Sequence, residues 1–158
     1  MKLIKKIIFV LLVVIVLVLY HWIKLDVRTS EVNMVSCVDG DTATFIIDGK
    51  EEKVRFLAID ALEVNEYYGK EASNYVCHAL ENASTITLEF EESSYRDKYN
   101  RVLAWAFVDG KLLQEELISR GLAQVKYLYD DYKYVDELFD LQEQAKTKKI
   151  GIWSDKHE

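Results

Sequence analysis

Residues 39–63 read DGDTATFIIDGKEEKVRFLAIDALE, and the expected topology of the chain depends on this stretch. Residues 42–47 and 52–59 are rich in β-branched and apolar residues, as strands commonly are. Asp48-Gly49 between them is a strong signal for a tight hairpin turn. The second run is apolar on both faces, which predicts a central, buried strand. A further strand over residues 31–38 completes a three-stranded meander.

The rest of the chain supplies further strands and helices. Apolar residues at helical spacing follow Gly69, and turn residues separate the later segments. The expected elements are a helix, two strands and two helices, over residues 69–82, 85–90, 101–108, 112–120 and 132–149. Five strands with a helix between the third and the fourth are the element order of the OB-fold, a five-stranded Greek-key barrel. We therefore expect an α+β, mainly β, domain over residues 31–154 with three helices, and a tail over residues 155–158.

The N-terminus is basic and then strongly apolar. Residues 1–6 contain three lysines, and residues 7–23 form an apolar run of 17 residues that ends in aromatic residues. This length is the short limit for a membrane-spanning helix, so we expect one transmembrane segment over residues 7–23 in contact with the lipid bilayer. A polar linker over residues 24–30 would follow it. The lysines favour a cytoplasmic N-terminus and an extracellular domain.

A cleaved signal peptide is the alternative interpretation of this N-terminus, and it would release a secreted domain. Cleavage sites need small residues after the apolar run. No Ala, Gly or Ser lies between Ile7 and Arg28, so an uncleaved anchor is favoured.

The two cysteines, Cys37 and Cys77, fall in an expected strand and an expected helix. An extracellular domain lies in an oxidising compartment, where a disulfide is allowed. Nothing in the sequence places the two residues close together, so we favour two free, partly buried thiols.

The chain from Ser30 onward is acidic, with 15 lysines and arginines against 26 aspartates and glutamates, a net charge of −11. Such a domain repels nucleic acid in general, because non-specific binding depends on neutralising phosphates. Binding of nucleic acid would therefore have to be local, through a divalent cation and a few converging arginines.

Two aspartates stand at ends of the predicted strands. Asp41 follows the Asp39-Gly40 turn, and Asp60 closes the buried strand. Together they could supply two carboxylate oxygens to one hard cation such as calcium, with the backbone carbonyl of Ala61 as a third ligand. The competing interpretation is that both are solvated turn residues.

Arg55 lies within an otherwise apolar, buried run, where an unpaired guanidinium would be costly. Its partner could be Asp41 or Glu63 in an internal salt bridge, or a phosphate held by two hydrogen bonds. Strict alternation along a strand would put Arg55 and Asp60 on opposite faces. A site shared by both therefore requires the chain to bend after Ile59.

Other residues near this site could take part in phosphoryl chemistry. Glu63 could remove a proton from a water molecule that attacks phosphorus, although taken on its own a surface glutamate is the favoured interpretation. Arg101 begins the fifth strand and could stabilise the charge that develops on phosphate. Tyr127 and Tyr129, two residues apart on a strand-like face, could stack on a base and its sugar, and packing in the core or a plain surface position is equally plausible for either.

Several ordered motifs resemble the staphylococcal nuclease (thermonuclease) family. They are VDGDT at 38–42, VRFLAIDALE at 54–63, GKEA at 69–72, DKYNRVLA at 97–104, GLA at 121–123, YLY at 127–129 and GIW at 151–153. The resemblance covers about residues 31–154. It implies an OB barrel with three helices and calcium-dependent hydrolysis of DNA and RNA, by in-line attack of water that leaves a 3′-phosphate.

The resemblance also implies roles for individual residues. Asp41 and Asp60 would be calcium ligands. Arg55 and Arg101 would contact the phosphate and stabilise the transition state, and Glu63 would be the general base. Positions near the bound nucleotide are matched by Lys98, Tyr99 and Tyr127. Two departures concern turns, since the family usually has proline at the position of Leu62 and glycine at that of Asn100.

The leading hypothesis is a monomeric, membrane-tethered extracellular nuclease that acts on DNA or RNA with Ca²⁺ and needs no protein partner. The alternative is an OB-fold module that binds a nucleotide or oligonucleotide with little or no turnover. A structural protein at the membrane is a third and weaker interpretation, because no structural role requires Arg55, Glu63 and Arg101 together.

Overall fold

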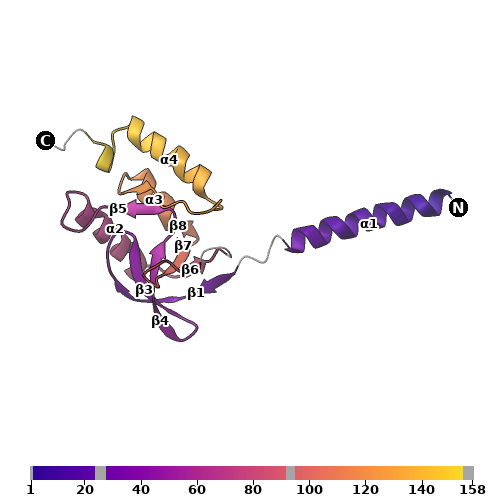
Figure 1. Ribbon diagram of the computed structural model, residues 1–158, viewed down its shortest axis with the longest axis horizontal. Coiled ribbons are helices and arrows are strands. Elements are labelled where there is room, and N and C mark those ends of the chain that lie inside the picture. The colour runs from indigo at the N-terminus through magenta and orange to yellow at the C-terminus, as the bar shows by residue number, and fades with distance from the viewer. Residues whose placement is uncertain (1, 24–27, 92–94, 155–158) are drawn as a thin grey trace.

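A computed structural model of the protein describes residues 2–23, 28–91 and 95–154, and Figure 1 shows the arrangement of its elements. The strands are β1 Thr29–Glu31, β2 Asn33–Cys37, β3 Thr42–Ile47, β4 Lys50–Phe56, β5 Ile59–Ala61, β6 Ile86–Glu89, β7 Val102–Val108, β8 Lys111–Leu112 and β9 Ala123–Val125. The helices are α1 Lys2–Ile23, α2 Gly69–Glu81, α3 Leu113–Ser119, α4 Val135–Thr147 and the short 3₁₀ helix η1 Gly151–Trp153.

The strands close into a barrel. The order of hydrogen-bonded neighbours is β1-β6-β7-β4-β3-β2, with β8 added beside β7. β1 and β2 are separated only by Val32 and pair with opposite ends of this order, so the chain between Thr29 and Cys37 joins the two edges. β4 and β7 are parallel, and the other neighbours are antiparallel. This arrangement fits the predicted α+β, OB-like fold, although the first strand is two short strands and not one over residues 31–38.

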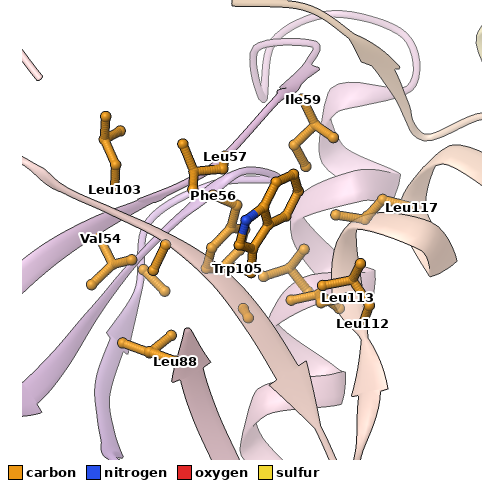
Figure 2. Close-up of a cluster of buried hydrophobic side chains, with 14 of the residues drawn as sticks. Val54, Phe56, Leu57, Ile59, Leu88, Leu103, Trp105, Leu112, Leu113 and Leu117 are labelled. Carbon is orange, nitrogen blue, oxygen red and sulfur yellow. The ribbon is translucent and has the colours of Figure 1, made fainter. Parts of the chain in front are cut away.

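The core lies around β4 and β7. β4 runs between β3 and β7, which confirms the prediction of a central strand. It is buried from Val54 to Phe56, whereas Lys50, Glu51 and Lys53 are exposed. Figure 2 shows Trp105 of β7 in the middle of the cluster, with Phe56 on one side and Leu113 and Leu117 of α3 on the other. A sheet face and a helix thus bury apolar area together here, which stabilises the barrel around β4 and β7.

The chain bends sharply after β4. This strand ends at Phe56, not at Ile59 as predicted, because Ala58 adopts a left-handed conformation with φ of 60°. Such a conformation is unfavourable for alanine, and it is held by the N–H of Lys126, which donates to the Ala58 carbonyl at 3.0 Å. Beyond the bend, β5 pairs with β9 in a separate two-stranded sheet. The bend needed for a shared site therefore exists, one residue before the expected place.

The helices cover the barrel. α2 contacts β2, and α3 contacts both β7 and α4. α4 begins at Val135, three residues later than predicted, and Tyr134 before it has a non-helical backbone with φ of −108° and ψ of 7°. Leu138 and Ala145 of α4 are buried, as expected for its inward face.

The N-terminal segment forms the single helix α1, whose apolar side chains are exposed from Ile7 to Val18. Among the residues that the structure describes, no helix reaches the length and hydropathy of a membrane-crossing segment. The transmembrane segment predicted over residues 7–23, and its contact with lipid, are therefore not confirmed. Of the predicted linker, residues 24–27 lie outside the described residues, and Thr29 and Ser30 belong to β1. The tail over residues 155–158 also lies outside them.

Cys37 at the end of β2 and Cys77 in α2 form a disulfide, with their Cα atoms 5.5 Å apart. The prediction of two free thiols is therefore wrong. The reason is tertiary: α2 packs against the β2 end of the barrel, and the sequence holds no local signal for that contact. The bond fixes α2 beside the turn that begins immediately after Cys37.

Replacing both cysteines with alanine should lower the free energy of unfolding by about 2–4 kcal/mol, because the bond closes a loop between residues 40 positions apart. Urea unfolding of wild type and the double variant measures this difference. Reductant should destabilise the wild type to the level of the variant and leave the variant unchanged. Equal unfolding midpoints for the two oxidised proteins would contradict the prediction.

Candidate active site

A cavity of about 590 Å³ opens beside the bend between β4 and β5. All five residues predicted to carry charge chemistry line it, and they are Asp41, Arg55, Asp60, Glu63 and Arg101. The residues predicted to hold a nucleotide also line it, and they are Lys98, Tyr99, Tyr127 and Tyr129. The structure therefore brings together side chains that are scattered over residues 41–129 of the chain.

Asp41 is held in a dense set of hydrogen bonds. Its Oδ1 accepts the Thr42 hydroxyl at 2.9 Å, and its Oδ2 accepts the Ala61 N–H at 3.0 Å. Its own N–H donates to Oδ1 of Asp39 at 3.0 Å. The residue is 7% exposed, and burial raises the pKa of Asp41 to about 6; Arg55 opposes the rise and Asp39 adds to it.

The turn that carries Asp41 requires glycine at position 40. A Cβ atom there would lie 2.7 Å from the Cβ of Ala61 and 2.8 Å from the Cβ of Ala72. These neighbours belong to β5 and α2, which leave no room for a side chain. The Asp39-Gly40 turn, which precedes β3, is thus packed against both β5 and α2. The Asp-Gly turn at Asp48 is exposed instead.

Arg55 on β4 is 8% exposed and lies between the two aspartates. Its Nη2 is 3.0 Å from Oδ2 of Asp41 and 3.7 Å from Oδ1 of Asp60, and its Nη1 donates to the Phe56 carbonyl at 2.9 Å. The internal salt bridge to Asp41 is present, and Asp60, not Glu63, is the second acid. Since both acids line the cavity, this pairing holds the guanidinium at the cavity wall.

Asp60 has further partners that the sequence did not indicate. Its Oδ2 accepts hydrogen bonds from Nζ of Lys126 at 2.8 Å and from Nε2 of Gln124 at 3.2 Å. Both donors come from β9 or the residue just after it, where Gln124 is the cross-strand neighbour of Asp60. The only signal in the sequence for β9 is the alternation of apolar and polar residues over residues 123–126. A strand of three residues is too short for such a pattern to identify it reliably.

Glu63 lines the cavity from a loop between β5 and α2, and it is exposed. Its N–H donates to Oε2 of Glu66 at 2.7 Å, and its carbonyl accepts the N–H of Glu66 at 2.8 Å. Gly69 lets the loop lie against the start of α2, because a Cβ there would be 1.8 Å from the Glu63 carbonyl oxygen. Glu66 and Gly69 thus fix the loop in which Leu62 replaces the usual proline.

Arg101 is positioned by Asp97. Oδ2 of Asp97 accepts the Arg101 Nε–H at 2.7 Å, and its Oδ1 accepts the N–H groups of Tyr99 and Arg101, each at 2.9 Å. Asn100 has φ of 64°, so it adopts the left-handed conformation that glycine would provide. The turn that presents Arg101 is therefore formed despite that departure.

Arg96 and Glu52 also support this turn and were not predicted. Arg96 makes two hydrogen bonds to the Glu52 carboxylate, at 2.7 and 2.9 Å, and donates to the Asn100 carbonyl at 2.8 Å. The contact ties the turn to β4. No spacing in the sequence relates residues 44 positions apart.

The tyrosines form an exposed aromatic rim. Tyr127 and Tyr129 have ring centroids 6.4 Å apart and nearly parallel planes, but Tyr127 has φ of 61° and both lie outside any strand. The predicted strand-like face is therefore wrong, although the rings do lie side by side. Tyr99 is 68% exposed, with Nζ of Lys98 5.0 Å from its centroid. Exposed ring faces at a cavity suit stacking on bases.

Asp97→Asn should destabilise the protein by about 1–3 kcal/mol at neutral pH, because it removes a charge-assisted hydrogen bond to Arg101. Burial alone would raise the pKa of Asp97, but the N–H groups and guanidinium of Arg101 and the N–H of Tyr99 outweigh it and hold the pKa below its usual range. The folded state therefore binds this proton more weakly than the unfolded state does. The stabilisation is present above the ordinary aspartate pKa of about 3.9 and disappears as pH falls through the lower folded value.

Urea unfolding of wild type and Asp97→Asn across this pH range measures the difference. Asp109→Asn is a suitable control, because Asp109 also accepts two backbone N–H groups, from Ser84 and Thr85, at an exposed turn. Its loss should stay below about 1 kcal/mol. A difference between wild type and Asp97→Asn that persists unchanged at the acid end would refute the assignment.

Comparison with known proteins identifies relatives of this chain. The model of the family described as "Staphylococcal nuclease homologue" matches residues 53–155. The chain is 39% identical over 134 residues to endonuclease YncB of Bacillus subtilis (strain 168), over 80% of this chain and 63% of that protein. It is 39% identical over 131 residues to the SPbeta prophage-derived endonuclease YokF of the same strain, over 78% of this chain and 44% of that protein.

A thermonuclease of Staphylococcus hyicus is 32% identical over 127 residues, which cover 77% of this chain and 74% of that protein. The chain thus spans less than two thirds of the two Bacillus proteins and most of the staphylococcal one. The family model covers Arg55, Asp60, Glu63, Arg101 and the later cavity residues, whereas Asp39 and Asp41 precede the matched range.

Proposed function

Because this chain belongs to the staphylococcal nuclease family, we propose that it is a nuclease that hydrolyses phosphodiester bonds of DNA, RNA or both. Its relatives bear the names endonuclease and thermonuclease. The observation that carries the proposal is the single cavity that Asp41, Arg55, Asp60, Glu63 and Arg101 share.

Calcium is the cofactor that suits the donors in this cavity. Asp41 and Asp60 line the cavity and offer carboxylate oxygens. Ala61, the third predicted ligand, is not among the lining residues, but its N–H donates to Oδ2 of Asp41 at 3.0 Å, so its backbone lies next to that carboxylate. No group of three or more acidic, histidine or cysteine side chains within the described ranges could hold a metal alone. Calcium accepts backbone and water oxygens beside carboxylates, so the pair and the Ala61 carbonyl suit it. When bound, it would neutralise charge on the phosphoryl oxygens.

The remaining residues supply the chemistry of water attack. Glu63 takes a proton from the water that attacks phosphorus in line with the leaving 5′-oxygen. The bond between phosphorus and the 5′-oxygen breaks, the 5′-oxygen takes a proton from solvent water, and a 3′-phosphate remains on the other product. Arg55 and Arg101 donate hydrogen bonds to the phosphoryl oxygens as negative charge develops on them. Both guanidiniums are already oriented by acids, Arg55 by Asp41 and Arg101 by Asp97. This preorganisation reduces the cost of ordering them in the transition state.

The nucleotide itself would lie against the aromatic rim. Tyr129 is 77% exposed and offers a ring face to a base, with Tyr127 stacked beside it. Lys98 and Tyr99 line the same cavity. Stacking of this kind tolerates any base and suits single strands. Because the rest of the domain is acidic and repels nucleic acid, the substrate must be held by these contacts in the cavity.

The full chain, incubated with single-stranded DNA or RNA in millimolar calcium, should cut the strand and leave 3′-phosphate ends. A calcium chelator should stop the reaction. Intact nucleic acid in the presence of folded protein and calcium would refute the proposal. Binding that depends on calcium without any product would instead indicate the binding-module alternative.

A matched pair of aspartates tests the site. Asp41 and Asp48 both belong to turns that contain Asp-Gly, but only Asp41 lines the cavity. Asp41→Asn should remove calcium-dependent cleavage, and Asp48→Asn should leave it unchanged. Equal activity of the two variants would exclude Asp41 as a ligand.

The domain functions outside the cytoplasm in this proposal. Its support is the Cys37–Cys77 disulfide, since such bonds persist in oxidising compartments and are rare in the cytosol. Thiol alkylation in intact cells, followed by mass measurement, tests this location. Two alkylated cysteines in the freshly trapped protein would contradict it.

A further inference from the structure

Lys126 places an ammonium group on one of the two carboxylates that would hold the cation. Its Nζ lies 2.8 Å from Oδ2 of Asp60. The Lys126 side chain is 47% exposed, whereas that of Asp60 is 19% exposed. The Lys126 ammonium therefore already pairs with one of the carboxylate oxygens that would bind the cation.

The fold, and not chance contact on a flexible surface, brings this lysine to Asp60. β9 runs antiparallel to β5, with Gln124 opposite Asp60. The Lys126 N–H continues this ladder by donating to the Ala58 carbonyl at 3.0 Å, so alternation puts the side chains of Gln124 and Lys126 on one face. Both side chains reach the same oxygen, Oδ2 of Asp60.

Two cations share the cavity carboxylates, but they differ in freedom. Arg55 is buried and is also bound to the Phe56 carbonyl, and its departure would leave the buried Asp41 carboxylate without its closest cation. Lys126 is half-exposed, and its ammonium also lies 5.0 Å from the centroid of the Tyr127 ring. Its long stem can carry the ammonium into solvent once the cation replaces it on Asp60. A divalent cation that approaches Asp60 would repel both, and only Lys126 can move away.

We propose that Lys126 is a tethered competitor of the divalent cation at Asp60. It satisfies the carboxylate in the cation-free protein and must withdraw when the cation binds. Lys126 thereby weakens cation affinity and raises the cation concentration at which the site fills. This inference rests on the proposed function, because it takes Asp60 as a ligand of calcium.

Isothermal titration of the full chain with calcium chloride, without nucleic acid, tests the proposal. Lys126→Met keeps the apolar stem and removes the charge, so its calcium Kd should fall by about 3- to 30-fold relative to wild type. Lys126→Arg keeps the charge and should stay close to wild type. Calcium should also raise the melting temperature of Lys126→Met more than that of wild type at equal concentration.

Lys133→Met is the matched control, because Lys133 pairs with Glu89 at 2.9 Å with a side chain that is 49% exposed, and it does not line the cavity. It removes the same net charge at a distance, so its Kd should stay within about twofold of wild type. Equal tightening by Lys133→Met and Lys126→Met would overturn the proposal, because a general field effect would explain both.

The outcomes separate this inference from the function on which it rests. If wild type and Lys126→Met bind calcium with equal affinity, the competitor role is wrong and the calcium site stands. Weaker binding by Lys126→Met would also overturn it, by showing that the lysine orients Asp60 for the cation. If neither protein binds calcium, the calcium site is wrong and the inference falls with it.

Discussion

Arg55→Ala should abolish nuclease activity and lower the free energy of unfolding by about 3–5 kcal/mol. The guanidinium is 8% exposed and lies 3.0 Å from Asp41, itself 7% exposed, so its removal leaves a buried carboxylate without its closest cation. Loss of a preorganised donor to the phosphoryl group should by itself reduce kcat by about 10²–10³. Activity assays and denaturant unfolding of the purified chain measure the two effects separately.

Two variants make this result interpretable. Arg55→Lys keeps the charge but not the fork of donors, so it should recover part of the stability and little of the activity. Arg120→Ala removes an exposed arginine that pairs with Glu116 at 3.1 Å, and it should cost less than about 1 kcal/mol with full activity. An Arg55→Ala protein as stable as wild type would show that Asp41 does not depend on this pair.

Glu63→Gln should reduce kcat by about 10²–10⁴, the range for removal of a general base, without changing the unfolding midpoint. The Glu63 side chain is exposed, and the loop is fixed through its backbone bonds to Glu66, which glutamine preserves. Steady-state cleavage of a defined oligonucleotide in saturating calcium measures kcat.

Glu71→Gln is the control for Glu63→Gln, because Glu71 is an exposed acid in α2 that does not line the cavity. Its kcat should equal that of wild type. Should Glu63→Gln keep more than about a tenth of the wild-type kcat, another group accepts the proton and the role assigned to Glu63 is wrong.

Local patterns predicted most of the barrel. β3, β4 and their hairpin follow from β-branched residues around Asp48-Gly49, and α2 and β7 follow from helical and strand patterns that span many residues. These signals are strong because apolar residues repeat at strand or helix spacing over six or more residues of each element. β5 and β9 were missed as a pair, since each has three residues and they meet only through a long-range ladder.

The candidate site shows the same division. Asp41, Arg55, Asp60, Glu63 and Arg101 were identified by their chemistry and by family motifs, and they line one cavity. Their supporting residues were not identified, because the contacts join distant positions. Glu52 supports Arg96 across 44 residues, and Lys126 contacts Asp60 across 66.

Sequence alone was enough to specify the order of the longer strands and helices, the central strand and the types of side chain available for phosphoryl chemistry. Folding added the left-handed Ala58, the Cys37–Cys77 bond and the placement of Lys126 on Asp60. A strand or helix of six or more residues shows a regular spacing of apolar residues, so it can be predicted from its own stretch of sequence. A bend at one residue, a disulfide or an ion pair depends on distances between elements, and those distances exist only once the barrel has closed.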